Sequence, residues 1–211
     1  MFLLKEITPS GSGDRVILKL VAEDRQALLT VMPEDIRRFE LKKGTRISSE
    51  LYDELAKNAE LEAAVRQGLA ILGYGTNSPN RLAEKLIHRG VSRDNATAAV
   101  AELIRRGYIN EENDVRRLCD SMISKKYGQR KIIIALRGRG YDRRALSIAE
   151  EHLADTDFSL VCESLIQNKI KKLPENREEM KKLLAKLTAL GYNVSDVKKA
   201  LARLSGGEIT P

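Results

Sequence analysis

A short segment built around one glycine occurs three times in this chain, and it constrains the fold more than any other feature. The glycines are Gly90, Gly140 and Gly191, so the copies are 50 and 51 residues apart. When the copies are aligned on them, each glycine has a leucine four residues before it, an alanine nine residues after it and a leucine thirteen residues after it. Repetition of this kind is typical of arrays in which each small unit packs mainly against its neighbours.

Each copy is predicted to contain two helices joined by a tight turn. The apolar residues before each glycine are spaced by one, three and four positions, which places them on one side of a helix. Glycine suits the position after a helix because it adopts the left-handed conformation that ends the helix. Two residues later stand Ser92, Asp142 and Asn193, whose side chains can accept hydrogen bonds from the start of the next helix. A further helix is predicted before each pair, at about residues 58–73, 111–126 and 157–171.

The N-terminal part of the chain has a different pattern. Three short segments rich in β-branched and aliphatic residues, 2–7, 16–21 and 26–31, are separated by residues typical of loops. Residues 41–45 are expected to finish this antiparallel meander. Because three strands with one apolar face are marginally stable by themselves, we expect the sheet to pack on the helix that follows.

We therefore expect a mainly α protein, an elongated array of three tandem three-helix repeats preceded by a small N-terminal antiparallel β meander. The expected boundaries are 1–57 for the β-rich extension with a short helix, 58–108 for the first repeat, 109–154 for the second, basic repeat, 155–205 for the third repeat and 206–211 for a tail.

The positive charge of the chain is concentrated in the middle copy. The whole chain has a net charge of +7, whereas residues 115–144 alone contain ten basic and two acidic residues and carry +8. Because repulsion in such a run is not compensated, we interpret it as a partner-binding surface rather than a solvated helix face. DNA phosphates would give salt-sensitive binding, and an acidic protein groove is the other possible partner; the sequence leaves both open. This basic cluster consists of Arg116, Arg117, Lys125, Lys126, Arg130, Lys131, Arg137, Arg139, Arg143 and Arg144.

The motifs of common enzyme classes are absent from the sequence. There is no phosphate-binding glycine loop, and two short Gly-x-Gly pairs lack the third glycine and the preceding strand of a dinucleotide site. Cys119, Cys162, His88 and His152 are too dispersed to predict a zinc site, and both cysteines are expected to be free buried thiols. We expect neither catalysis nor a cofactor nor a metal.

The sequence also favours a soluble protein without a membrane partner. Its longest apolar run after the N-terminus is Ile132–Leu136, whereas a membrane-spanning helix needs about 18 such residues. The four N-terminal apolar residues are too few for a signal peptide. We expect a cytoplasmic monomer.

The helix–glycine–helix units raise the alternative of a sequence-specific helix-turn-helix protein. Acidic residues such as Glu102 and Glu150 interrupt the exposed faces of the second helices, which disfavours base readout. Tyr141 and Tyr192 follow two of the glycines, and Val91 follows the third. We interpret this position as a packing site rather than a base-stacking platform.

Two stretches of the middle region resemble the RecX family of regulatory proteins, which modulate the RecA recombinase. They are Leu103-Ile-Arg-Arg-Gly-Tyr-Ile-Asn-Glu-Glu112 and Lys126-Tyr-Gly-Gln-Arg-Lys-Ile-Ile-Ile-Ala-Leu-Arg-Gly-Arg-Gly140. The resemblance covers about residues 60–205. It departs from the family in two places. Asn110 and Glu111 stand where the family tends to have two aspartates, and the family's Arg-x-x-Ser-x-x-Glu-Leu motif has become Gly75, Ser78, Arg81 and Leu82.

The resemblance implies a non-enzymatic modulator that lies along the groove of the RecA–single-stranded DNA filament. Such a protein limits filament extension, ATP hydrolysis, strand exchange and coprotease activity, and so acts in recombination, DNA repair and the SOS response. The implied partners are the RecA filament and, more weakly and with salt sensitivity, single-stranded DNA. The residues alone also allow a general nucleic-acid-binding protein without a recombinase partner, or a structural adaptor.

Overall fold

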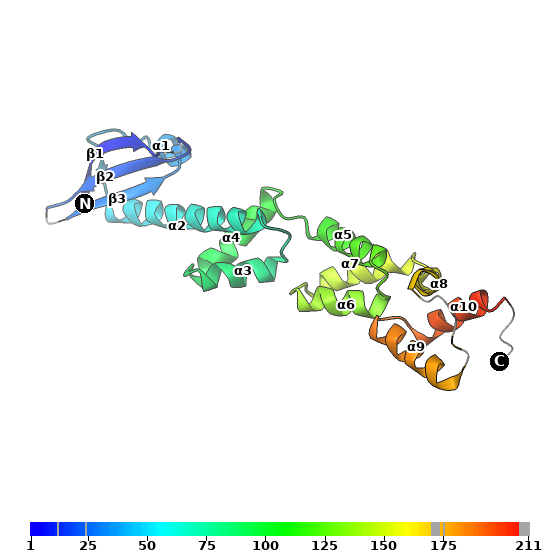
Figure 1. Ribbon diagram of the computed structural model, residues 1–211. Helices are drawn as coiled ribbons and strands as arrows, with labels where there is room; N and C mark the ends of the chain where they lie inside the picture. Colours follow the sequence, from blue (N-terminus) through cyan, green and yellow to red (C-terminus); the bar gives the residue numbers. More distant parts are fainter. Residues whose placement is uncertain (12, 24, 170–173, 175, 207–211) are drawn as a thin grey trace. The chain divides into compact units, whose positions relative to one another are not determined.

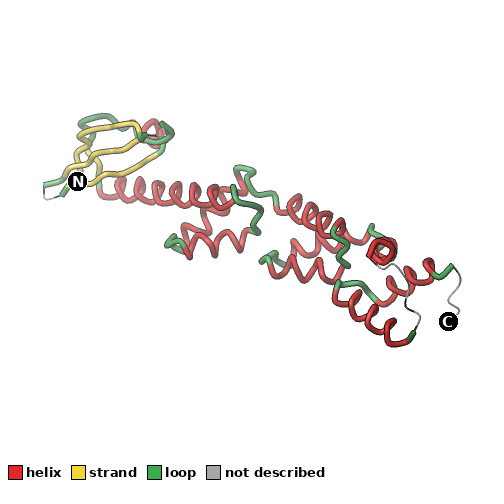
Figure 2. Tube along the Cα trace, viewed as in Figure 1, coloured by secondary structure: helices red, strands yellow, loops and turns green. Residues whose placement is uncertain are grey.

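Strands occupy the N-terminal part of the chain and helices the remainder (Figures 1 and 2). The computed structural model describes residues 1–11, 13–23, 25–169, 174 and 176–206. Within this part the protein is mainly helical with a small antiparallel sheet, which confirms the expected fold class at this level. The last two residues of the helix predicted at 157–171, and the predicted tail beyond Gly206, lie outside the described residues.

The chain divides into two compact units. The first unit contains Met1–Gly75 and Leu82–Tyr108, and the second contains Thr76–Arg81 and Ile109–Pro211.

The sheet of the first unit has four strands in the order β3-β2-β1-β4. Strands β1 (Phe2–Pro9), β2 (Val16–Val21) and β3 (Gln26–Val31) form the predicted meander, with Leu3 opposite Val21 and Val16 opposite Val31. A shift in the β1–β2 register between Leu4 and Glu6 marks a β-bulge.

Alternate strand residues supply the core of this sheet, as the two-residue period of a strand requires. Phe2, Leu4, Leu18 and Leu20 are buried together with residues that follow the meander. One of these is Leu55 of helix α2 (Ser49–Leu72), so the sheet packs against the helix that follows it, as expected.

Two expected boundaries in this unit were wrong. Residues 41–45 form a turn, and the last strand, β4 (Arg46–Ile47), comes just after it, preceded by the short helix α1 (Pro33–Arg38). The helix predicted at 58–73 begins nine residues earlier, at Ser49, because the Ser48 hydroxyl accepts a hydrogen bond from the Leu51 N–H at 3.2 Å and caps it.

The helices beyond α2 have tightly packed apolar sides. In the first unit α2 packs against α4 (Arg93–Arg105), and α3 (Pro79–His88) begins in the second unit and continues into the first. The buried residues of the second unit, from Val115 to Ala200, form one core. The helices of that unit are α5 (Glu111–Ser124), α6 (Gln129–Gly138), α7 (Arg143–Ala154), α8 (Phe158–Lys169), α9 (Arg177–Ala189) and α10 (Val194–Leu204).

The three aligned glycines adopt the predicted conformation. Gly90, Gly140 and Gly191 have φ angles of 88°, 80° and 92°, all in the left-handed region. In each turn the residue after the glycine donates its backbone N–H to the leucine carbonyl four residues before the glycine, at 3.1–3.3 Å. This bond is the one that closes a helix C-terminus in the Schellman motif.

The caps of the following helices agree with the prediction at two of three positions. The Ser92 and Asp142 side chains accept hydrogen bonds from Asn95 N–H and Ala145 N–H, at 3.3 and 2.9 Å. At the third position the arrangement is reversed, because the backbone N–H of Asn193 donates to the Asp196 carboxylate at 3.4 Å.

In the second unit, the turn after α6 contacts the start of α3, and the turn after α9 contacts the start of α6. The Ser78 hydroxyl, just before α3, donates to the Arg139 carbonyl at 2.8 Å. Gly128, just before α6, donates its N–H to the Leu190 carbonyl at 2.8 Å. Ser78 is twelve residues before Gly90, and Gly128 is twelve residues before Gly140, so equivalent positions of the aligned copies make equivalent contacts.

Candidate partner-binding surface

The basic cluster lies on α5, α6, α7 and the segments between them. Seven of its ten residues are exposed, and Arg116, Lys126 and Lys131 are partly buried. Arg130 and Arg137 are seven residues apart on α6, which places them on one side of the helix and about 10 Å apart along its axis. Arg139 and Arg143 follow at the Gly140 turn.

Four of the cations occupy positions that the helix dipole disfavours. Arg130 and Lys131 lie in the first turn of α6, and Arg143 and Arg144 lie in the first turn of α7. Neither first turn contains an acidic residue, whereas α4, α5, α9 and α10 all have one. The positive end of a helix repels cations, so these side chains add to a local positive potential instead of neutralising one.

Few of the charges in the cluster are engaged in a direct ion pair or ring contact. Arg116 pairs with Glu112 at 3.0 Å, and the Lys131 ammonium lies 4.6 Å from the centre of the Tyr127 ring. The other eight basic residues form no ion pair with any residue that the structure describes. Unpaired cations on a common surface attract anionic partners.

Two members of the cluster are also held by structural contacts. Arg116 reaches α7, where its guanidinium lies 3.4 Å from the His152 ring, which in turn contacts the Asp120 carboxylate at 2.7 Å. The carbonyl of Lys126 accepts a hydrogen bond from the Tyr192 hydroxyl at 2.8 Å. The structure thus places Arg116 at a helix–helix contact and Lys126 in a turn.

The two tyrosines that follow the glycines are buried, which confirms their packing role. Burial raises the pKa of Tyr141 to about 12, with further increases from nearby carboxylates, and raises the pKa of Tyr192 as well. Cys119 and Cys162 are free and buried, as predicted, and burial raises the pKa of each thiol to about 11.

Two partly buried carboxyl groups lie beside the Gly140 turn. Burial raises the pKa of Glu111, and Asp142 raises it further while Arg144 opposes the shift. Burial also raises the pKa of Asp114, against the influence of Arg117. The cations therefore stabilise these carboxylates only in part.

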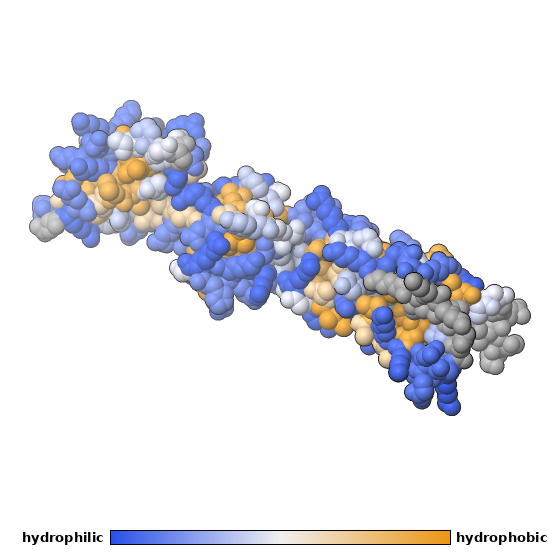
Figure 3. Space-filling view, in the orientation of Figure 1, coloured by the Kyte–Doolittle hydropathy of each residue, from blue (hydrophilic) through white to orange (hydrophobic). Residues whose placement is uncertain are grey.

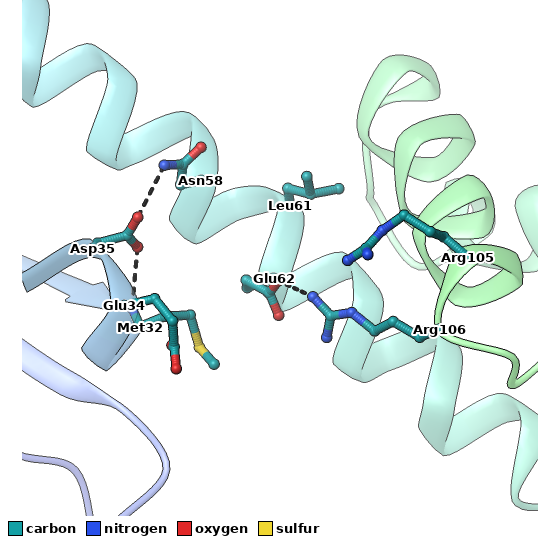
Figure 4. Close-up of a pocket in the computed structure, with 8 residues that line it drawn as sticks. All are labelled: Met32, Glu34, Asp35, Asn58, Leu61, Glu62, Arg105 and Arg106. Carbon is teal, nitrogen blue, oxygen red and sulfur yellow. Dashed lines mark hydrogen bonds and ion pairs between the residues drawn. The ribbon is translucent and has the colours of Figure 1, made fainter. Parts of the chain in front are cut away.

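The first unit contains a pocket of about 420 Å³ whose walls carry both signs of charge (Figure 4). Asn58 of α2 donates to the Asp35 carboxylate at 3.2 Å on one side, and Arg106, just after α4, pairs with Glu62 on the other. Hydrogen bonds from Arg105 and then Arg106 lower the pKa of the neighbouring Glu102 to about 2. The ionic groups of this pocket are thus satisfied by one another.

A second pocket, of about 600 Å³, lies on the second unit next to the basic cluster. Its lining includes Arg130, Ile133 and Ile134 of α6, Glu150 of α7 and Asn193 at the start of α10. Apart from Arg130, none of these residues was identified from the sequence as part of the candidate site. The sequence feature that could have indicated this pocket is Ile134, because the aligned copies have Glu84 and Ala185 at the same position.

The described residues contain neither a candidate metal site nor a candidate membrane-spanning helix. No three side chains among histidine, cysteine, aspartate and glutamate gather there in a way that could hold a metal ion. None of the helices in the described ranges combines the length and the hydrophobicity needed to cross a membrane.

Comparison with known proteins gives consistent matches in sequence and structure, although no protein-family model matches the chain. The chain is 22% identical over 178 residues to "Regulatory protein RecX" of Caldanaerobacter subterraneus subsp. tengcongensis, covering 84% of this chain and 89% of that protein. A crystal structure of regulatory protein RecX superposes with a TM-score of 0.75 and 18% identity, over 94% of this chain and 98% of the other. The chain is thus similar to RecX proteins in sequence and in fold.

Other RecX proteins match over shorter stretches. RecX of Lactobacillus gasseri is 29% identical over 93 residues, which are 44% of this chain and 34% of that protein. The crystal structure of RecX from Lactobacillus salivarius gives a TM-score of 0.60 at 20% identity, over 69% of this chain and 97% of the other.

The structure explains how this chain accommodates its departures from the RecX sequence pattern. The Asn110 side chain caps α5 by accepting a hydrogen bond from the Asn113 N–H at 3.1 Å, a role that an aspartate at this position would also perform. The serine of the Arg-x-x-Ser-x-x-Glu-Leu motif is Ser78, which is buried and contacts the Gly140 turn.

Proposed function

We propose that this protein is a non-enzymatic inhibitor of the RecA recombinase that binds along the groove of the RecA–single-stranded DNA filament. In this proposal it limits filament extension, ATP hydrolysis and strand exchange. The resemblance of the sequence to RecX proteins supports the partner. The observation that carries the binding surface is the basic cluster, in which nine of ten cations form no ion pair with the described residues.

The proposal includes the arrangement of the helices as three tandem repeats, with boundaries 58–108, 109–154 and 155–205. It is supported by the equal glycine turns and by the pairs α2 with α4, α5 with α7 and α8 with α10, which pack together. In such an array the basic middle repeat would face the filament, and binding would involve the filament's DNA or an acidic strip of the recombinase.

The test is RecA ATP hydrolysis on single-stranded DNA, with this protein titrated in at two salt concentrations. Inhibition well below one protein per recombinase monomer is expected, since a few bound molecules suffice to block filament extension. Inhibition only at amounts that coat the DNA would instead indicate competition for phosphates, and would contradict the proposal.

A charge-reversal variant tests the surface. Replacing Arg130, Lys131, Arg137 and Arg139 by glutamate should abolish inhibition while leaving the helical circular dichroism signal intact. The matched control reverses four exposed lysines of α9 and α10, namely Lys182, Lys186, Lys198 and Lys199, and should inhibit like the wild type. Wild-type inhibition by the first variant would show that the basic cluster does not face the filament.

The second candidate is a general nucleic-acid-binding protein. The unpaired cations at the first turns of α6 and α7 favour it, since phosphates would bind there without displacing an internal partner. It predicts tight, salt-sensitive binding to single-stranded DNA that added recombinase does not improve, which fluorescence anisotropy on a labelled oligonucleotide can measure.

A further inference from the structure

One large aliphatic side chain in the basic cluster is exposed without a structural reason. Ile134 lies on α6 between Arg130 and Arg137, and 64% of its surface is accessible. The aligned copies have Glu84 and Ala185 at this position, so the fold of a copy does not require an apolar residue there. An exposed isoleucine is informative here because it adjoins a concave surface and unpaired charges.

The concave surface beside Ile134 is the pocket of about 600 Å³ on the second unit, which we call the α6 groove. Ile133, also in its lining, is partly buried against the core, so the groove has an apolar floor. Asn193 lines the far side, and the adjoining Val194 is 63% exposed. Figure 3 shows hydrophobic residues gathered around α6 on this face of the second unit.

The charges at the groove distinguish between classes of ligand. Arg130 lines the groove and has no ion pair, and Arg137 lies two turns further along the same side of α6. Glu150 lines the groove from α7 and likewise makes no ion pair with a described residue. A continuous chain of phosphates passing through the groove would be repelled by Glu150, whereas a segment with single, spaced carboxylates can contact Arg130 and Arg137 and avoid it. An apolar centre with a polar rim is the usual composition of a protein–protein contact.

We propose that the α6 groove binds an acidic protein segment that inserts one large aliphatic or aromatic side chain beside Ile134 and places a carboxylate on Arg130 or Arg137. This inference rests on the proposed function and deepens it: the α6 groove contacts the protein of the filament, not its DNA. The remaining cations of the cluster supply the long-range attraction that brings the two together.

The test compares Ile134→Ser with two controls in the full-length protein. Leu160→Ser removes a side chain of similar size that is 52% exposed on α8 and does not line the groove, and Ile134→Leu keeps an apolar group in place. The probe is a RecA filament assembled on poly(dT) with ATP, and the readout is the concentration that halves ATP hydrolysis. Binding to poly(dT) alone is measured in parallel, and sedimentation velocity reports self-association.

We expect Ile134→Ser to raise the half-inhibitory concentration about tenfold, or about 1.4 kcal/mol, because the inserted side chain loses its apolar contact. Ile134→Leu and Leu160→Ser should inhibit like the wild type, and all variants should bind poly(dT) equally. Equal inhibition by Ile134→Ser and the wild type would overturn the groove assignment while leaving the proposed function standing.

Three other outcomes would also overturn it. A parallel loss of poly(dT) affinity in Ile134→Ser would assign the groove to DNA. Self-association of the wild type that Ile134→Ser abolishes would assign it to a second copy of this chain. Absence of any inhibition by the wild type would reject the proposed function and the groove assignment together.

Discussion

At the scale of single residues, two glycines with the same conformation have different surroundings. Gly191 has a φ of 92°, and an added Cβ would lie 2.4 Å from the Lys131 backbone nitrogen and 2.5 Å from its Cβ. Gly90 has a φ of 88°, and nothing lies within 4 Å of such an atom. Gly90→Ala should therefore lower the free energy of unfolding only by the cost of the left-handed conformation, about 1–2 kcal/mol. Gly191→Ala should cost at least about 3 kcal/mol, because the backbone contact must also open.

Urea unfolding followed by circular dichroism measures the loss of stability in each of the two variants. The two thiols add a measurement that reports on the second unit alone. Cys119 and Cys162 are buried in the second unit, so reaction with a thiol reagent reports its opening. Gly191→Ala should accelerate thiol modification, and Gly90→Ala, in the first unit, should leave the rate unchanged. Equal losses of stability in both variants would show that the contact with Lys131 contributes nothing.

At the scale of helices and turns, Ser78 connects the start of α3 to the end of α6. Its hydroxyl accepts from the Arg81 N–H at 3.3 Å and donates to the Arg139 carbonyl at 2.8 Å, and the residue is 1% exposed. Ser78→Ala should cost about 2–3 kcal/mol, because it removes a helix cap and leaves the Arg139 carbonyl without this donor. Ser92→Ala removes only the exposed cap of α4 and should cost about 1 kcal/mol. Thermal unfolding measures both, and equal costs would contradict a role for Ser78 in joining the helices.

Turns and helix caps could be predicted from the sequence, whereas contacts between distant segments could not. The glycine turns, the caps at Ser92 and Asp142 and the first three strands follow from local rules of backbone geometry, and they were predicted correctly. The early start of α2 was missed because its first residues mix charges with few apolar positions, and the Ser48 cap decides the boundary. The groove around Ile134 depends on how three helices meet, and no local pattern encodes that.

At the scale of the whole molecule, the two units carry ionisable groups with opposite pH responses. In the first unit the pKa of Glu102 is lowered to about 2 by Arg105 and Arg106, so its contribution to stability is present above about pH 4.5 and is lost as the pH falls towards 2. In the second unit burial raises the pKa of Cys119 and Cys162 from 9.0 to about 11, so their contribution is present below pH 9 and is lost as the pH rises towards 11.

Protonation of Glu102 in acid should therefore weaken the first unit, and ionisation of the buried thiols in alkali should weaken the second. In the second unit, Glu111 and Asp114 reinforce the contrast, because carboxyl groups with raised pKa values gain stability when acid protonates them. The urea midpoint, measured by circular dichroism at pH 3, 7 and 10, should be lower at pH 3 and at pH 10 than at pH 7, which gives an acid limb and an alkaline limb. Glu102→Gln should flatten the acid limb alone, and the double variant Cys119→Ala/Cys162→Ala should flatten the alkaline limb alone, since the first removes a group that titrates in acid and the second removes groups that titrate in alkali. If Glu102→Gln changed the alkaline limb, or the cysteine variant the acid limb, the assignment of these pH responses to separate units would be wrong.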